Sequence, residues 1–338
     1  MGSHSEKFTR QDEIKQCVGR MDQVASVTPV TLGDGSARGV RAFDVENSSG
    51  LRIQVLVDRA LDIGAASYKG INLCWHSPAG FANPAFYEPE GDGWLRTFGG
   101  GLLVTCGLTN VGPPATENGR SYGQHGRIGN IPAEKVSYGG AWQDDRYLLT
   151  VSGQIRQGVL FGENLIMHRA ISMALGEPKI EIETVIENAG FEPSPLMLLF
   201  HCNFGWPLID SGTKLAGNFV NIKPRDEEAA KNQENALTFE SPAPGYKEKV
   251  YFLAPSENNP RISLVNEKLP LTVSFQYNRE ELTHLTEWKM MGQGAYVVGI
   301  EPGNCHPISI TEARKKNDLQ FIAPGEKKRF ALTIEVME

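Results

Sequence analysis

The feature that most constrains this chain is a period-two alternation of apolar and polar residues, which recurs in short segments from about residue 41 to the end. Successive side chains of a strand point to opposite faces, so each such segment would bury one face of a sheet. The clearest examples are Leu51–Val57, Ile180–Ile186, Leu271–Tyr277 and Phe330–Val336. The pattern predicts a mainly β protein.

Glycine and proline separate these segments and do not gather in one linker. The 338 residues include 36 Gly and 20 Pro, which favour turns. Strand signals continue without a break in composition, and all-β folds can exceed roughly 200 residues as one unit. We therefore predict a large antiparallel β-supersandwich, with an N-terminal segment at residues 1–30 and a single β-sandwich domain at residues 31–338.

Helical patterns are few. Thr9 would cap a first helix, whose apolar face carries Ile14 and Val18. A second helical pattern covers Glu280–Trp288. The charged stretch Pro224–Asn235 predicts a solvated loop or short helix inserted between strands.

The charge balance argues against two classes of partner. There are 33 Lys and Arg against 40 Asp and Glu, a net charge of −7, and no basic run. Nucleic acids and anionic membranes are bound by clustered Lys and Arg, so we expect neither. Apolar runs such as Pro195–Phe200 are far shorter than the ~20 residues that cross a bilayer, and the first 30 residues show no signal-like run. We expect a cytoplasmic protein.

The cysteines and histidines do not form a metal-binding or disulfide pattern. Five scattered cysteines without a C-x-x-C motif predict reduced thiols. His125, His201 and His306 lack the short spacing of dedicated zinc sites, so no metal is predicted.

Two ionisable residues each follow an apolar run. His201 comes after Leu196–Phe200, and Glu301 comes after Ala295–Ile300. Partial burial at such strand ends would shift their pKa values, and a carboxylate and an imidazole placed in this way can share a proton transfer. An isolated histidine at a strand end is nevertheless more often structural.

Other motifs have competing interpretations. Cys202 follows His201 directly, and adjacent strand residues face opposite ways, which favours a buried thiol over a Cys–His dyad. Gly99–Gly101 lacks a phosphate-loop frame and favours a tight turn or bulge. Arg59 stands between two aspartates, so both a structural ion pair and a substrate contact remain open.

Six short motifs follow one another in this order: Asp58-Arg59-Ala60-Leu61-Asp62-Ile63, Gly99 to Leu108, His125-Gly126-Arg127-Ile128, His201-Cys202-Asn203-Phe204-Gly205, Glu301-Pro302 and Ala323-Pro324-Gly325-Glu326. This ordered set resembles the galactose mutarotase-like (aldose 1-epimerase) superfamily, and within it a bacterial branch known only as a domain of unknown function. The resemblance implies a sugar-binding β-supersandwich.

The resemblance also implies roles for single residues. Glu301 matches the family's base and His201 its acid. His125 matches the histidine that assists at the ring oxygen, and Arg59 the arginine that holds substrate hydroxyls. Asp62, in the same motif as Arg59, joins the expected substrate-binding residues. Independently of the resemblance, Trp288 is a candidate ring for stacking on the apolar face of a sugar, although core packing is the more common role of such a ring.

The motifs also differ from those of the galactose enzymes. Those enzymes carry His-Gly-Gly, whereas here Arg127 follows Gly126, and their Tyr-Phe-Asn is replaced by Cys202-Asn203-Phe204-Gly205 after His201. Arg127 and Lys289 would add positive charge to the pocket. That charge would suit a carboxylated, phosphorylated or sulfonated sugar.

The sequence thus predicts a sugar mutarotase, an isomerase that opens and recloses a hemiacetal ring without a cofactor or metal. Its expected partner is a small sugar, including an acidic or phosphorylated one. Two alternatives stay open: a non-catalytic carbohydrate-binding or sensor protein on the same fold, and a lyase or epimerase acting at a carbon-bound proton. The sequence does not specify the sugar or the oligomeric state.

Overall fold

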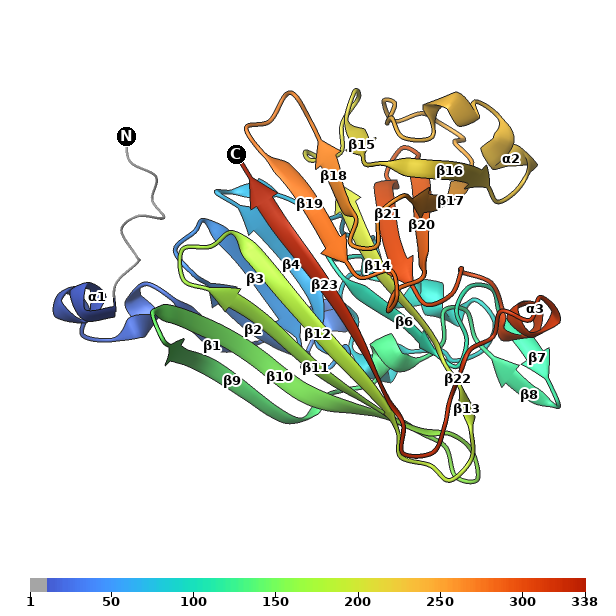
Figure 1. The fold of residues 1–338 in the computed structure, drawn as a ribbon, viewed down its shortest axis with the longest axis horizontal. Helices are drawn as coiled ribbons and strands as arrows, with labels where there is room; N and C mark the ends of the chain where they lie inside the picture. Colours follow the sequence, from blue (N-terminus) through green and yellow to red (C-terminus); the bar gives the residue numbers. More distant parts are fainter. Residues whose placement is uncertain (1–10) are drawn as a thin grey trace.

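Antiparallel sheets make up most of the computed structural model, which describes residues 11–338 (Figure 1). The eight-stranded sheet has the order β15 (Lys214–Ala216), β18 (Arg261–Val265), β19 (Thr272–Tyr277), β23 (Lys327–Met337), β12 (Lys179–Asn188), β11 (Asn164–Ala174), β10 (Arg146–Gly158) and β9 (Glu134–Gln143). The six-stranded sheet has the order β16 (Phe219–Pro224), β17 (Lys249–Pro255), β20 (His284–Met291), β21 (Tyr296–Gly303), β14 (Met197–Gly205) and β6 (Val104–Leu108).

The remaining strands form one larger and two small sheets. The five-stranded sheet runs β1 (Ser26–Thr31), β2 (Arg41–Glu46), β3 (Leu51–Leu56), β4 (Asp62–Tyr68) and β5 (Ile71–Asn72). The small sheets pair β13 (Ser194–Pro195) with β22 (Phe321–Ile322), and β7 (Ala115–Glu117) with β8 (Arg120–Tyr122). Side chains from all three large sheets meet in one main apolar core.

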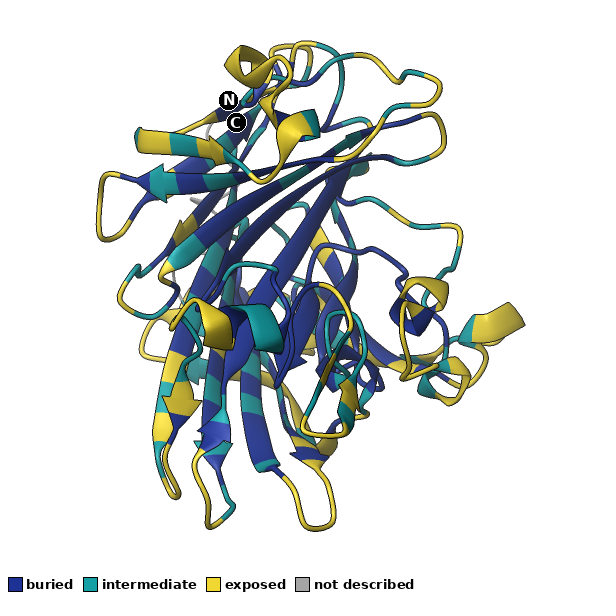
Figure 2. Ribbon diagram, turned by 90° about the vertical axis from the view of Figure 1, so that its right-hand side faces the viewer, coloured by how far each residue is buried: buried dark blue, intermediate teal, exposed yellow. Residues whose placement is uncertain are grey.

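The predicted strands are confirmed. All four alternating segments are strands, namely β3, β12, β19 and β23. In β12 and β23, Ile182 lies opposite Leu332 and both face the core. Figure 2 shows buried residues concentrated along the strands and exposed residues in the turns, as expected for segments that each bury one face.

The helices are short: α1 (Gln11–Cys17), α2 (Glu227–Ala230) and α3 (Ile310–Lys315). Helix α2 falls within the charged stretch predicted to be a loop or short helix. The predicted cap Thr9 lies outside the described residues. None of the described helices is long and apolar enough to cross a membrane.

The helix predicted at Glu280–Trp288 is wrong, because most of this stretch belongs to β20. This strand pairs with β17 on one side and β21 on the other, so its backbone groups are satisfied by two neighbours. Nine residues of apolar pattern cannot separate a short helix from a central strand, and here the sheet pairing decides.

The glycine run at residues 99–101, where a tight turn or bulge is expected, is irregular backbone in which Gly100 forms an isolated antiparallel bridge with His76. Gly100 and Gly101 have φ of +71° and +99°, a region that favours glycine. A Cβ at Gly100 would lie 2.5 Å from the carbonyl oxygen of Trp75, so the chain passes too close for any side chain. The backbone N–H of Gly101 donates to the carbonyl of Trp75 over 2.8 Å, which holds residue 75 against the segment that leads into β6.

Strand β14 is shared between two apolar clusters, and this arrangement orients the site. Phe200 and Cys202 join the main core, whereas Met197 and Leu199 join a second cluster that includes Trp94 and Phe98. His201 therefore faces away from Cys202, as predicted. Cys202 is a buried free cysteine whose thiol pKa is raised by burial.

Candidate active site

The expected acid and base lie side by side in the six-stranded sheet. His201 is on β14 and Glu301 on β21, each one position from the paired residues Cys202 and Ile300 and on the opposite face. The Nε2 atom of His201 and the Oε1 atom of Glu301 are 3.1 Å apart. The two residues are only 4% and 2% exposed. A carboxyl and an imidazole at this distance can exchange a proton.

Burial decides where the proton of this pair resides. It raises the pKa of Glu301 to about 8, with a smaller contribution in the same direction from the carboxylate of Glu248. It lowers the pKa of His201 to about 3. At neutral pH we therefore assign the proton to Glu301, which donates to Nε2 of His201. The imidazole hydrogen then lies on Nδ1, a buried atom without a hydrogen-bond partner among the described residues.

A second histidine lies beside the pair. The ring centroid of His125 is 5.8 Å from that of His201. Burial lowers the pKa of His125 to about 4, so its ring is neutral at neutral pH. Its Nδ1 accepts a hydrogen bond of 3.4 Å from the backbone N–H of Gly112, which leaves the ring hydrogen on Nε2. His125 can therefore donate a hydrogen bond to a ligand oxygen.

Aromatic rings surround the imidazole of His201. Phe98, Trp288 and Trp94 have ring centroids 5.3, 5.4 and 6.4 Å from it. Trp94 also stacks on Phe98, with centroids 4.2 Å apart. These rings exclude water from the pair and offer flat apolar faces of the kind that pack against the C–H face of a sugar.

An ion pair adjoins Trp288 of this aromatic wall. The indole Nε1 of Trp288 donates to Glu248 over 3.0 Å, and the other carboxylate oxygen of Glu248 accepts from Arg225 over 2.9 Å. Both charged side chains are partly exposed. Neither residue is predicted from the sequence as part of the site. Glu248 lies in a loop, and Arg225 lies in the charged stretch Pro224–Asn235, whose composition indicates only a solvated segment.

Gly299 provides the space for the acid–base pair. It lies two residues before Glu301 on the same face of β21, opposite Trp288 in β20. A Cβ at this position would lie 2.6 Å from Oε1 of Glu301 and 3.2 Å from Cε1 of His201. The sequence signal for this role was a glycine inside an apolar strand, two positions before a carboxylate.

We expect Gly299→Ala to lower turnover about 10²-fold while the protein remains folded. The new methyl group would push away the carboxyl end of a flexible side chain, and a displacement of about 1 Å is enough for a loss of this size. The measurement is the exchange between the anomers of a bound aldose, the reaction that the family resemblance implies, followed by NMR. Gly158→Ala is the matched control, because a Cβ in this strand would meet no atom closer than 3.9 Å. Wild-type turnover in Gly299→Ala would contradict this positioning role.

Arg59 and Asp62 lie behind the site. The guanidinium of Arg59 donates to the backbone carbonyls of Gly129, Ala82 and Thr97 over 2.8, 2.8 and 2.9 Å. These hydrogen bonds hold Thr97, which precedes Phe98, close to Gly129, which follows the His125 loop. This geometry supports a positioning role, and the predicted contact with substrate hydroxyls remains a prediction.

Asp62 takes part in a buried ion pair. Its Oδ1 lies 2.8 Å from the guanidinium of Arg169 and accepts from the hydroxyl of Thr105. Its Oδ2 accepts from the backbone N–H of Thr105 over 2.9 Å. The carboxylate is therefore used to join β4, β6 and β11, and its predicted role in substrate binding gains no support from these contacts.

Lys289 points away from the acid–base pair. It is next to Trp288 on β20, so it projects from the other face of the sheet. Its ammonium donates to the carbonyls of Asn235 and Thr238 over 3.0 and 2.6 Å and pairs with Glu240 at 2.6 Å. The predicted positive charge of Lys289 is thus neutralised outside the aromatic wall.

Arg127 is also engaged elsewhere. Its guanidinium donates to the carbonyl of Gly158 over 2.8 Å and lies 3.5 Å from the carboxylate of Glu163. These partners lie at the ends of β10 and β11 and hold the loop that carries His125. The structure therefore brings His201, Glu301, His125 and Trp288 together, and directs the two predicted anion-binding cations elsewhere.

Comparison with known proteins identifies the family. The family model described as "Domain of unknown function (DUF4432)" matches residues 37–336. The chain belongs to this family. No curated protein matches it in sequence.

Solved structures share the fold of this DUF4432 protein. A protein of Klebsiella pneumoniae, provisionally named an aldose 1-epimerase, is 24% identical, with a TM-score of 0.89 over 98% of this chain and 90% of that one. A galactose mutarotase-like protein of Clostridium acetobutylicum is 12% identical, with a TM-score of 0.66 over 94% and 99% of the chains. A galactose 1-epimerase of Lactobacillus acidophilus is 13% identical, with a TM-score of 0.60 over 93% and 99%. The predicted galactose mutarotase-like β fold is confirmed.

Proposed function

We propose that this protein is an aldose mutarotase, in which His201 and Glu301 open and reclose the hemiacetal ring of a sugar. The observation that carries the proposal is the buried His201–Glu301 contact of 3.1 Å, together with the Nδ1 atom of His201, which has no hydrogen-bond partner among the described residues. The fold shared with mutarotase-like proteins supports the same reaction class.

The protons held by Glu301 and His201 allow a proton relay from the C1 hydroxyl to the ring oxygen of the sugar. The carboxyl of Glu301 takes the proton of the C1 hydroxyl on one oxygen and passes its own proton from the other to Nε2 of His201. His201 releases its Nδ1 proton to the ring oxygen, so the C1–O5 bond breaks and an open-chain aldehyde forms. After rotation about C1–C2, the reverse transfers close the ring on the other face. The pair returns to its starting protonation state, and no further reactant is consumed.

The surrounding residues support the same chemistry. Neutral His125 can donate a hydrogen bond to the sugar as charge develops on oxygen. Trp288 and Phe98 provide apolar faces for the ring, and the partly exposed Arg225–Glu248 ion pair beside Trp288 can bind hydroxyl groups. These groups favour a neutral aldose over the acidic or phosphorylated sugar that the sequence had suggested.

The pH dependence of catalysis tests the relay. The active form carries one proton on the pair, and the raised pKa of Glu301 means that this proton is lost as the pH rises through about 8. We therefore expect kcat/KM to be level across the neutral range and to fall at alkaline pH. The measurement is anomer exchange by NMR over a panel of neutral and anionic aldoses, corrected for the buffer rate at each pH. A rate that instead increases through pH 8 would rule out the relay.

A further inference from the structure

Exposed apolar side chains gather at one end of the eight-stranded sheet. The connection between β10 and β11 carries Leu160 and Phe161, which are 82% and 100% exposed, and the connection between β12 and β13 carries Phe191, which is 95% exposed. Both connections lie at the lower end of the molecule in Figure 1. We call these three side chains the apolar tip. Exposed clusters of apolar residues mark interaction sites, whereas single exposed residues need no such explanation.

Asn164, the first residue of β11, holds the two connections side by side. Its backbone carbonyl accepts from the N–H of Ala189 over 2.9 Å, and its side-chain nitrogen donates to the carbonyl of Ala189 over 3.1 Å. A Cβ at Gly190 would lie 3.8 Å from the Cβ of Asn164. Phe191 therefore follows a segment that is fixed against the base of the connection that carries Phe161.

The connection between β10 and β11 is held in one conformation. The N–H of Val159 donates to the carbonyl of Glu163 over 2.9 Å, and the buried carboxylate of Glu163 pairs with Arg120 at 2.6 Å. Phe161 has a φ of +61°, a region that bulky residues seldom adopt. Backbone strain of this kind occurs at surfaces that bind other molecules, so the exposure of Phe161 has a functional explanation in an interface.

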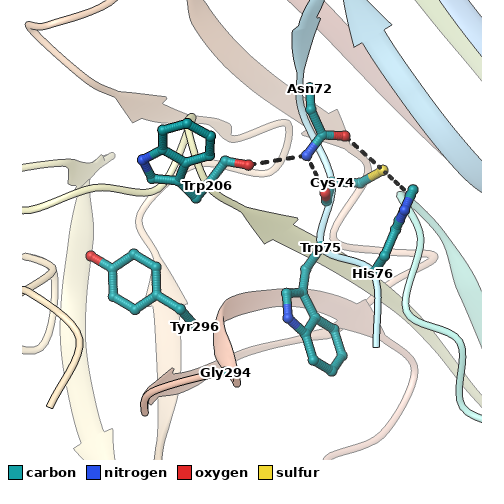
Figure 3. Close-up of a pocket in the computed structure, with 7 residues that line it drawn as sticks. All are labelled: Asn72, Cys74, Trp75, His76, Trp206, Gly294 and Tyr296. Carbon is teal, nitrogen blue, oxygen red and sulfur yellow. Dashed lines mark hydrogen bonds between the residues drawn. The ribbon is translucent and has the colours of Figure 1, made fainter. Parts of the chain in front are cut away.

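Two other strongly exposed apolar side chains lie apart from the apolar tip. Trp206, which is 68% exposed, lines a cavity of about 250 Å³ together with Trp75 and Tyr296 (Figure 3). Its ring therefore belongs to a concave surface. Val220, which is 73% exposed, lies on β16, the edge strand of the six-stranded sheet near the top of Figure 1. The apolar tip differs from both because side chains of two separate connections combine there.

The charged residues beside the apolar tip favour a second copy of this chain as the partner. Arg156 on β10 and Glu192, which directly follows Phe191, are both exposed. Arg156 donates to the neutral side chain of Asn164 over 2.7 Å, and no ion pair joins Arg156 or Glu192 to another described residue. One free cation and one free anion are complementary to the same two charges in a second copy. A bilayer would instead attract a cluster of cations.

We propose that the apolar tip joins two copies of this chain about a two-fold axis, with Phe161 and Phe191 packed between the copies and Arg156 of each copy paired with Glu192 of the other. A buried phenylalanine covers roughly 150–250 Å². Four of these rings and two Leu160 side chains therefore bury about 1,000 Å², the lower limit of a specific interface. The expected dimer is weak and depends on protein concentration. Dimerisation through this surface does not depend on the proposed catalytic activity.

The first experiment measures the mass of the protein in solution by analytical ultracentrifugation. Wild type should shift from monomer to dimer between about 1 and 500 µM. Phe161→Ser should raise the dissociation constant at least about tenfold, because a few central aromatic residues contribute most of the free energy of an interface. Val220→Ser removes an exposed apolar side chain elsewhere and should leave the constant unchanged. A monomer at every concentration, including one that binds phosphatidylglycerol vesicles, or a dimer unaffected by Phe161→Ser, would overturn the proposal.

The second experiment exchanges the two charges. Arg156→Glu leaves two acidic residues beside the apolar tip, and Glu192→Arg leaves two basic ones, so each variant alone should dimerise at least about tenfold more weakly than wild type. An equimolar mixture should regain the dimer, because each acidic tip then meets a basic one. A mixed dimer also shows that both variants are folded. Wild-type dimerisation of each variant alone, or no gain in the mixture, would overturn the two-fold arrangement.

Discussion

Replacement of Glu301 by Gln is expected to reduce turnover by about 10²- to 10⁴-fold, with little change in sugar affinity. Gln has nearly the same size and can hydrogen bond to the C1 hydroxyl, so the ground-state complex should form. Its amide cannot take the hydroxyl proton, and it has no carboxyl proton to pass to His201. The measurement is anomer exchange of an aldose shown to bind, with the uncatalysed rate subtracted.

The sheet itself offers a matched control for this variant. Glu287 is a fully buried carboxyl on the neighbouring strand, and burial raises its pKa to about 8 as well. It lies opposite Ile300 and therefore faces away from His201. Glu287→Gln should retain wild-type turnover. Full exchange in Glu301→Gln would assign the base to another residue, and no enhancement by wild type on any bound aldose would favour the carbohydrate sensor.

The strands could be predicted from the local alternation of apolar and polar residues. Alternation in Ile180–Ile186 and Phe330–Val336 is strong because each strand faces the core on one side only. The pattern at Glu280–Trp288 misled because β20 is a central strand with charged residues buried on one face. Hydrophobic periodicity does not indicate that Glu287 and Lys289 are buried. The ammonium of Lys289 is held by Glu240 and by the carbonyls of Asn235 and Thr238, all of which are distant in the sequence.

Some residues of the candidate site could likewise be predicted from local sequence, and others could not. His201 and Glu301 could be identified from the ends of apolar runs and from the family motifs, because their positions depend on strand parity. The environment of Arg59 could not be predicted, since its three carbonyl partners come from segments between 23 and 70 residues away that belong to no strand. Phe98 and Glu248 contribute to the site only after distant loops have folded against β14 and β20.

Replacement of His201 by Asn should produce a loss of about the same size as Glu301→Gln, because either change interrupts the relay from C1 to the ring oxygen. The double variant should therefore lose far less than the product of the two single losses. Thermal unfolding of each variant separates this effect from misfolding, since His201 and Glu301 are both buried and in contact. Multiplicative losses would mean that the two residues act in independent steps, with the proton of Glu301 playing no part in the protonation of the ring oxygen. Near-equality of single and double variants is the result that a shared proton requires.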